Sequence, residues 1–333
     1  ITTMNILIVN NSKLPVIYYG GTERVIWYLG KTLSRLGHKV SFLVAQGSTC
    51  DFAEIIERNP ELDVIDQIPA AIDLVHFHFT PKGVEKLQVP YLITIHGNPN
   101  PVELLDKNAV FVSENHAIRH NAEAFVHNGL DWDDYGNPQL DNKRSYFHFL
   151  GKAAWRVKNV KGAINTTLKL KGERLHVLGG SRLNIKMGFR FTWQPSARFY
   201  GMVGGEEKMN QLKHSKGLVF PVRWHEPFGL AIIESLYFGA PVFGTPYGSL
   251  PELVNQDIGF LSNSSTKLSE AMAHCQDYNR KTCHDYAATH FNAEEMTKAY
   301  LNLYENVIQG KEINRNIPQT IAVDTPKFLD WVK

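Results

Sequence analysis

The chain has few cysteines and no long apolar run. Its three cysteines, Cys50, Cys275 and Cys283, are odd in number and lack Cys-x-x-Cys spacing. This pattern is typical of reduced thiols and argues against a disulfide framework or a zinc site. No apolar stretch reaches the ~20 residues of a membrane-spanning helix. The first residues lack the basic segment and apolar core of a secretory signal, so we expect a cytoplasmic protein.

Acidic residues are almost absent from one long segment. Between residues 142 and 205 the sole acid is Glu173, against thirteen lysines and arginines. Such a block suits an anionic ligand or an anionic surface, although we expect most of its cations on a solvated face. It shows no nucleic-acid-binding motif and no interleaved aromatic platform, so we expect no nucleic acid partner. Peripheral contact with an anionic membrane that carries a lipid-linked acceptor stays open.

Apolar segments alternate with helical ones along the whole chain. We expect buried strands at residues 5–10, 40–45, 74–79, 91–95 and 109–113, and one near 125–127. Thr22 and Gly37 are the expected N-cap and stop of a helix over 22–36. After a polar linker at 131–144, a second series predicts strands at 146–150, 174–178, 218–221 and 241–244. Helices are expected near 160–170, 205–214, 229–238, 266–278 and 293–308.

This order predicts an α/β protein with two doubly wound parallel-sheet domains. We expect an N-terminal domain over residues 1–143 and a C-terminal domain over 144–312. The remaining residues, 313–333, carry enough apolar surface to form a tail that packs back towards the N-terminal domain. Two such domains place a ligand site at the carboxyl ends of their strands.

The segment from Arg223 to Pro251 carries the strongest chemical signal. Glu226 comes just before a helix start, and Glu234 is the one charge in the apolar stretch that follows. A carboxylate buried there needs a hydrogen-bonding partner. The first amides of this helix, at Phe228, Gly229 and Leu230, suit an anion. A nucleotide diphosphate with its ribose would satisfy both features, although Glu234 as a structural carboxylate and Glu226 as a helix-dipole partner remain alternatives.

Five segments, in the expected order, resemble the retaining GT-B glycosyltransferases of family 4 (glycosyl transferases group 1). Residues 226–234 match the family's E-x7-E motif. Residues 20–24 resemble the family's first glycine loop, and residues 127–131 its N-G-x-D element. Residues 151–162 resemble its paired basic motif, and residues 257–261 the element after its second glycine turn. The resemblance implies the GT-B fold, in which two Rossmann-like domains face a cleft, with the acceptor on the N-terminal side and the nucleotide-sugar donor on the C-terminal side.

The resemblance also implies roles for single residues. Glu226 would contact the transferred sugar, Glu234 the ribose hydroxyls, and His96 the reaction centre. Lys152 and Lys161 would hold the donor diphosphate, with Arg156 or Lys158 as possible substitutes. Lys152 stands where the family usually has arginine, and the basic spacing is longer than usual, so which of Arg156, Lys158 and Lys161 reaches the phosphates stays open. We predict Glu226, His96, Lys161 and Arg156 as the catalytic group. Backbone contacts with the donor are implied for six further residues, namely Gly21, Met202, Val203, Phe228, Gly229 and Leu230.

The implied reaction is sugar transfer from a nucleotide-diphosphate sugar to an acceptor hydroxyl, with retention and without a metal or another cofactor. UDP is preferred over GDP on family frequency, and the acceptor is unknown. Asp131-Trp-Asp133 spells a metal-binding D-x-D, but Asp131 belongs to the N-G-x-D element. His76 and His78 share one strand face without a third ligand, which makes a poor zinc site. The alternatives are a nucleotide-sugar epimerase of this architecture and an inactive nucleotide-sugar-binding homologue.

Overall fold

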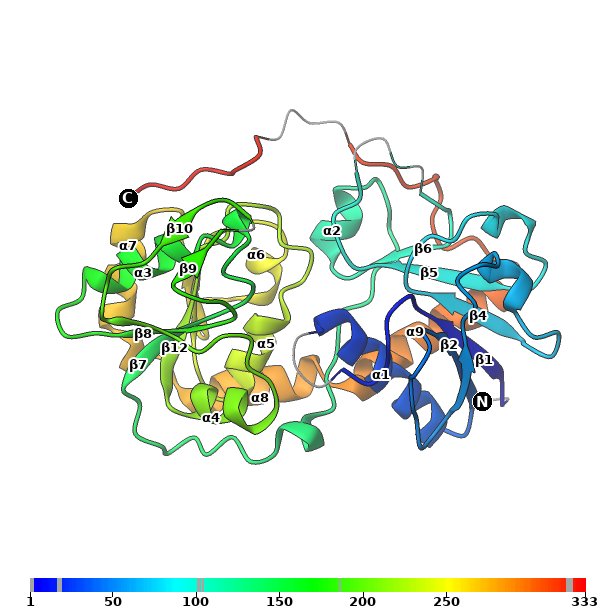
Figure 1. Ribbon diagram of the computed structural model, residues 1–333, viewed down its shortest axis with the longest axis horizontal. Helices are drawn as coiled ribbons and strands as arrows, with labels where there is room; N and C mark the ends of the chain where they lie inside the picture. The colour runs from blue at the N-terminus through cyan, green and yellow to red at the C-terminus, as the bar shows by residue number, and fades with distance from the viewer. Residues whose placement is uncertain (1–2, 17–19, 101–102, 104, 186, 322–325) are drawn as a thin grey trace. The chain divides into compact units, whose positions relative to one another are not determined.

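The computed structural model describes residues 3–333 apart from 17–19, 101–102, 104, 186 and 322–325. The chain divides into two compact units, each built on one six-stranded parallel sheet (Figure 1). The first unit contains residues 3–16, 20–131 and 291–321, and the second contains 132–290 and 326–333. Within the described part of the chain, no helix is both long and apolar enough to span a bilayer.

The sheet of the first unit has the strand order β3-β2-β1-β4-β5-β6. Except for the edge strand β3, its strands are buried along most of their length, as expected for a parallel sheet covered on both faces. The strands are β1 Asn5–Val9, β2 Lys39–Val44, β3 Glu54–Glu57, β4 Leu74–Phe77, β5 Tyr91–Ile95 and β6 Ala109–Phe111. The order reverses between β1 and β4, so the loops that follow these two strands flank the switch point of the sheet.

Helices α1, Gly21–Arg35, and α9, Ala293–Ile308, pack together in the first unit. α1 begins at Gly21 with Gly20 as its N-cap, so the prediction of Thr22 as the cap is wrong. Gly37, at φ +89°, follows the end of this helix as predicted. A shorter helix, α2 at Glu114–Ile118, follows β6 with Ser113 as its N-cap.

The chain after residue 290 differs from the predicted domain division. We expected 293–308 in the C-terminal domain, but α9 belongs to the first unit, because its buried Tyr300 and Tyr304 reach Thr94 and His76. Asn314 is also buried there and donates to the carbonyls of Lys107 and Ala109. The last residues, 326–333, lie on the second unit instead. There Val332 donates to the Asn263 carbonyl, and the Asp330 carbonyl accepts from Tyr247.

The sheet of the second unit has the order β11-β8-β7-β12-β13-β14, with its switch point between β7 and β12. Its strands are β7 Tyr146–Leu150, β8 Leu175–Leu178, β11 Ala197–Phe199, β12 Ser215–Phe220, β13 Val242–Gly244 and β14 Gly259–Leu261. Its helices are α3 Val160–Leu168, α4 Gly205–Lys213, α5 Leu230–Tyr237, α6 Leu250–Leu253, α7 Ser265–Ala273 and α8 Arg280–His290. α3 and α7 share one apolar core with β7, β8 and β12.

The connection from β8 to β11 is unusual. Adjacent parallel strands are usually joined through a helix. Here the described residues of the connection contain a two-stranded antiparallel hairpin, β9 Leu183–Asn184 with β10 Arg190–Phe191 (Figure 1).

Two other sequence predictions need correction. The strand predicted near 125–127 is a single bridge between Phe125 and Phe111. The linker predicted at 131–144 begins with a short 3-10 helix, η3 at Trp132–Tyr135, which packs on α5 because Trp132 stacks on Tyr237 at a centroid distance of 4.2 Å.

Candidate active site

The loops that follow β7 and β12 meet at the switch point of the second sheet, and an ion pair joins them. Lys158 ends the 3-10 helix η4, Arg156–Lys158, after β7, and Glu226 lies in the loop after β12. Lys158 Nζ donates to both carboxylate oxygens of Glu226, at 2.8 and 2.7 Å. Both side chains are at least nine-tenths buried. A buried pair of this kind persists because each charge compensates the other.

Aromatic rings surround this pair. Trp224 Nε1 donates to Glu226 Oε2 at 2.7 Å. The Lys158 ammonium also lies 4.9 Å from the centroid of the Trp224 ring and 5.3 Å from that of Phe220. Contacts with ring faces add cation–π attraction, which is strengthened where water is excluded. The Glu226 carboxylate is therefore held in place by three donated hydrogen bonds.

The backbone of Glu226 is fixed by a glycine turn. The Ser249 amide donates to the Glu226 carbonyl at 2.9 Å, and the Ser249 hydroxyl donates to the Phe228 carbonyl at 2.7 Å. Gly248 has φ +63°, and a Cβ placed on it would lie 2.3 Å from the Glu226 backbone N and O. A residue other than glycine at 248 would therefore push the Glu226 loop away.

Glu234 forms a second buried ion pair, eight residues further along. It lies on α5, is 2% exposed, and its Oε1 accepts from Lys208 Nζ on α4 and, at 2.7 Å, from the Tyr135 hydroxyl of η3. The partner that its burial requires therefore comes from within the unit. This geometry supports the alternative of a structural carboxylate, and the ribose contact stays a prediction.

The tip of α5 has the geometry predicted from the sequence. Gly229 is the N-cap at φ +88°, Leu230 begins the helix and Phe228 is buried. The first-turn amides of a helix have no acceptor within the helix and carry its positive dipole end. Met202 and Val203 follow β11, with Met202 exposed and Val203 buried.

The remaining predicted cations do not join Glu226. Lys152 is half-buried after β7 and lies 5.3 Å from the ring centroid of Trp155. Arg156 and Lys161 are exposed, and Arg156 stacks on Phe328. Both line a cavity of about 580 Å³ whose lining includes neither Glu226 nor Lys158. Of the competing cations, the structure therefore pairs Lys158 with the predicted sugar-contacting carboxylate.

In the first unit, His96 follows β5 and pairs with His78, which follows β4. His78 Nδ1 and His96 Nε2 are 2.8 Å apart, so one ring donates and the other accepts. This bond requires that at least one ring is neutral. Burial lowers the pKa of His96 to about 4 and holds the pKa of His78 well below its ordinary value. Both rings are therefore neutral near pH 7.

The rejected metal motifs have structural partners. Asp131 is buried and accepts from Lys31 and Arg35, at 2.7 and 3.3 Å. The buried His76 bonds to Tyr304 and Thr94, each at 2.7 Å. Among the described residues, no group of three or more histidine, cysteine or carboxylate side chains is arranged to hold a metal ion.

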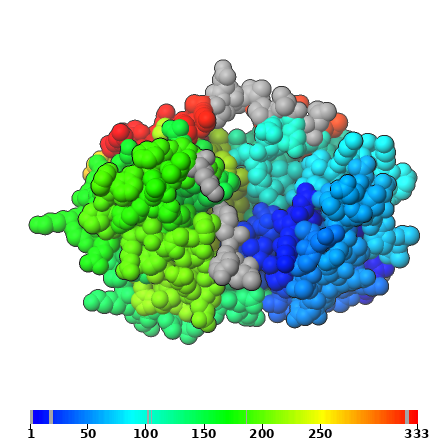
Figure 2. Space-filling view, in the orientation of Figure 1, coloured from blue at the N-terminus to red at the C-terminus, as the bar shows by residue number. Residues whose placement is uncertain are grey.

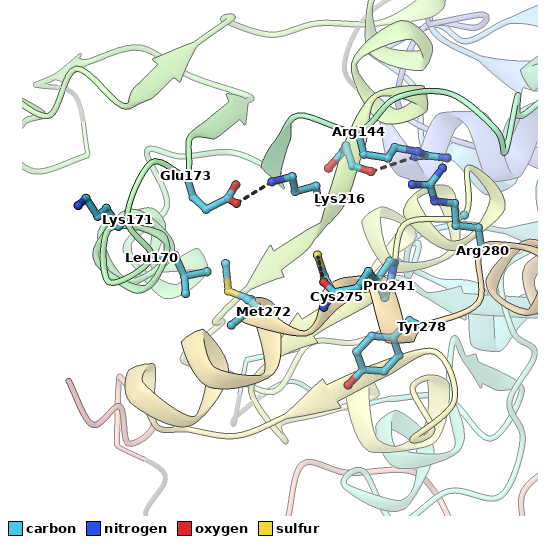
Figure 3. A pocket seen from close by; sticks show the side chains of 14 residues that line it. Arg144, Leu170, Lys171, Glu173, Lys216, Pro241, Met272, Cys275, Tyr278 and Arg280 are labelled. Carbon is cyan, nitrogen blue, oxygen red and sulfur yellow. Dashed lines mark hydrogen bonds and ion pairs between the residues drawn. The ribbon is translucent and has the colours of Figure 1, made fainter.

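A second pocket, of about 460 Å³, lies at the opposite edge of the second sheet, where the strands begin (Figure 3). Its two arginines hydrogen-bond to backbone carbonyls. Arg144 donates to those of Leu212, Ser215 and Phe238, and Arg280 donates to those of Leu140 and Asn142. Ligands of doubly wound sheets bind at the carboxyl ends of the strands. We therefore assign this pocket no part in the site.

The sequence analysis did not predict four residues that hydrogen-bond to the predicted site residues. Tyr135 and Lys208 contact Glu234, Trp224 contacts Glu226, and His78 contacts His96. The apolar surroundings of Glu234 predicted that its carboxylate needs a partner, but nothing in the sequence shows which lysine is that partner. His78 was considered as a zinc ligand and rejected, although its position one strand from His96 at the same sheet edge allowed their contact.

The two sheets, their strand orders and the comparison with solved structures define the fold as that of the GT-B glycosyltransferases, as predicted. The family model described as Glycosyl transferases group 1 matches residues 144–277, which lie within the second unit. The resemblance to group 1 is thereby confirmed, whereas the assignment to family 4 stays a prediction.

Individual relatives agree with this result. The chain is 30% identical over 125 residues to O-antigen chain mannosyltransferase C of Escherichia coli, a match that covers 34% of this chain and 33% of that protein. AviGT4, a glycosyltransferase of avilamycin A biosynthesis, superposes with a TM-score of 0.75 at 19% identity, covering 92% of this chain and 98% of that one. Anabaena HepE with bound UDP-glucose gives 0.67 at 14% identity, covering 91% and 100%.

Proposed function

We propose that the protein is a retaining glycosyltransferase that uses a nucleotide-diphosphate sugar. The observation that carries this proposal is the Lys158–Glu226 pair at the switch point of a domain matched by the group 1 family. Ligands of doubly wound sheets bind at this position. The names of the relatives point in the same direction, because one is a mannosyltransferase and another was solved with UDP-glucose.

In the proposed donor complex, Glu226 contacts hydroxyls of the transferred sugar and Lys158 neutralises the diphosphate beside it. Lys152 is the second phosphate-binding cation, and the amides around Gly229 add donors. Glu234 accepts from the ribose, and the backbone at Met202 and Val203 contacts the base. In the first unit, Gly21 admits the diphosphate and His96 faces the reacting sugar. UDP is the first nucleotide to test, followed by GDP.

We propose substitution on a single face of the sugar, without a metal. The bond between the anomeric carbon and the β-phosphate oxygen breaks with both electrons passing to the phosphate. The acceptor hydroxyl attacks from the same face, and its proton passes to the departing phosphate. Lys158 and the helix tip stabilise the developing negative charge. Both buried glutamates of this region are held by a lysine, Glu226 by Lys158 and Glu234 by Lys208. Ion pairing makes a carboxylate a weak nucleophile for double displacement.

The test is a thermal-shift screen of the full chain with UDP, GDP, ADP and their sugars. A ligand present at about 100 times its Kd adds about 2.7 kcal/mol to the free energy of unfolding. We expect one nucleotide diphosphate to raise the Tm and its nucleoside to have little effect. If no nucleotide raises the Tm, the proposed donor class is wrong. Retention is tested by the anomeric configuration of the released sugar, and a covalent glycosyl-enzyme would exclude the single-face substitution.

The alternative enzyme class is a nucleotide-sugar epimerase on the same fold. Incubating the donor without an acceptor separates the two. A transferase releases nucleoside diphosphate and free sugar slowly, whereas an epimerase returns a changed sugar.

A further inference from the structure

The hairpin between β8 and β11 turns an apolar face to solvent. Its apolar side chains occupy every second position and are all exposed, namely Leu183, Ile185, Met187, Phe189, Phe191 and Trp193. Phe189 and Trp193 keep 80% and 81% of their surface accessible. The register pairs Leu183 with Phe191, and alternate positions of a strand share a face. Exposed contiguous apolar surface of this kind marks an interaction site.

The polar face of the same hairpin points inward. Arg182 donates to the carbonyls of Thr192, Gln194 and Ala197, and Arg190 donates to the Ser181 carbonyl. Both guanidinium groups lie over the Phe199 ring, at 5.7 and 5.3 Å from its centroid. A sheet with one solvated face normally has the reverse arrangement. These charged hydrogen bonds hold the polar face of the hairpin against the rest of the unit. The apolar face is therefore kept on the outside by specific contacts.

The surroundings of the hairpin are cationic. The hairpin borders the 580 Å³ cavity, whose lining includes Met187, Phe189 and Phe191 of the apolar face. Arg156, Lys161 and Arg223 also contribute to this cavity. Arg198, on β11, is exposed as well. The hairpin lies within the segment from residue 142 to 205 that contains thirteen basic residues and a single acid. In the space-filling view, the green segment that includes the hairpin forms part of the surface facing the viewer (Figure 2).

We propose that this hairpin inserts into the interfacial layer of an anionic lipid bilayer. Tryptophan and phenylalanine favour the membrane–water interface, and basic residues nearby attract anionic headgroups. Nucleic acid fits less well, because Leu183, Ile185 and Met187 share the face and cannot stack on bases as aromatic rings do. A protein partner would not require the surrounding excess of cations. This inference does not depend on the donor or on the reaction proposed above.

The test is co-sedimentation of the full chain with vesicles of phosphatidylcholine alone and of equal parts phosphatidylcholine and phosphatidylglycerol. We expect binding to the mixed vesicles that weakens with salt, and little binding to neutral ones. The double substitution Phe189→Ser/Trp193→Ser should weaken partitioning at least about tenfold, since two large apolar side chains no longer leave water. Arg198→Glu should reduce binding to the mixed vesicles as well.

Matched controls and a depth-sensitive signal complete the design. Leu62→Ser/Ile118→Ser removes two side chains that are 51% and 60% exposed in the first unit, and it should leave binding unchanged. Lipids brominated on their chains should quench tryptophan fluorescence in the wild type, and Trp193→Phe should lose that quenching while still sedimenting.

Three outcomes would overturn the inference: no binding to anionic vesicles, binding unaffected by Phe189→Ser/Trp193→Ser, or quenching that survives Trp193→Phe. Binding of a single-stranded oligonucleotide that depends on this face, or dimerisation through it, would assign the face to another partner. Nucleotide-induced thermal shifts measured on the same variants show separately whether the donor site is intact.

Discussion

Lys158 Nζ contacts both carboxylate oxygens of Glu226 across the switch point of the second sheet, at 2.8 and 2.7 Å. The pair joins two loops that follow neighbouring strands, β7 and β12. It therefore couples the position of a cation to that of a carboxylate where the fold binds its ligands. In the proposed donor complex, a nucleotide sugar would meet two charges that are already oriented, which would reduce the reorganisation needed when charge develops on the phosphate.

Removing one member of this pair should be costly. Lys158→Met leaves Glu226 buried without its countercharge, and we expect a loss of about 3–5 kcal/mol in the free energy of unfolding, measured by urea titration. The double variant Lys158→Met/Glu226→Leu should regain most of that stability and still lack turnover. A double variant as unstable as the single one would show that the ion pair is not the dominant contact.

Glu226 and Glu234 should have separable kinetic effects. Glu226→Ala should mainly lower kcat, and Glu234→Ala should mainly weaken donor binding. The loss of one charged hydrogen bond, about 1.5–3 kcal/mol, corresponds to at least about tenfold in donor affinity. Lys208→Met is the control, because it breaks the Glu234 ion pair while it keeps the carboxylate. If Glu234→Ala lowers stability but leaves nucleotide affinity at the wild-type value, Glu234 is a structural residue and its ribose contact is excluded.

Gly248 should be intolerant of a side chain. A Cβ there would lie 2.3 Å from backbone atoms of Glu226, so we expect Gly248→Ala to lower both stability and turnover. Gly172→Ala is the matched control, because φ is +82° and nothing lies within 4 Å of the added Cβ. The control should cost about 1–2 kcal/mol of backbone strain alone. Equal effects of the two substitutions on thermal stability and turnover would contradict the role given to this turn.

His78 is proposed as a positioning residue for His96. His78→Phe removes the hydrogen bond but keeps a ring, and we expect kcat to fall about tenfold with donor KM little changed. His78→Asn keeps a side chain that can hydrogen-bond to His96, so it should recover part of the rate. A purely structural role predicts instead that the two variants lose stability without a specific change in kcat.

Acid should destabilise the first unit between pH 6.5 and about 4. The pKa of His96 falls to about 4 and that of His76 to about 3 on burial, while the unfolded value is 6.5. Below pH 6.5 the unfolded chain binds protons that the folded one excludes, so the free energy of unfolding decreases as pH falls. Each such histidine contributes up to about 1.4 kcal/mol per pH unit in this window. Urea titrations at a series of pH values measure the slope, and a flat profile would contradict the buried, neutral state.

Much of the fold followed from the pattern of the sequence. The strands at Tyr91–Ile95 and Tyr146–Leu150 and the helix Ala293–Ile308 were predicted at their observed bounds, because long buried apolar runs and strong helical periodicity leave little ambiguity. The unit to which α9 belongs could not be predicted, since its periodicity shows that one face is buried but not against which sheet. β11 and β14 were not predicted, because only one of the three residues of each is buried and neither forms an apolar run.

The candidate site was predictable in its residue types and less so in its contacts. The sequence signals of a helix start predicted that Glu226 and Gly229 lie at the tip of a helix and Glu234 within it, because the start of a helix is determined by local sequence. The identity of their partners depends on which loops the sheet order brings together, so the pairing of Glu226 with Lys158 could not be predicted from the sequence. Which of Lys158, Arg156 and Lys161 contacts the diphosphate stays a prediction. The hairpin at 183–191 was also not predicted, although its alternation of apolar and polar residues is a strand signal.

The most direct test of the central claim is release of nucleoside diphosphate from nucleotide sugars by the full chain, compared with the Glu226→Gln variant. We predict that the wild type releases nucleoside diphosphate from one donor class above the uncatalysed rate. We predict that the same nucleotide still stabilises the Glu226→Gln variant, but that this variant forms nucleoside diphosphate from the nucleotide sugar far more slowly. Equal release by the two proteins, or neither binding nor release by the wild type with any donor, would contradict the account.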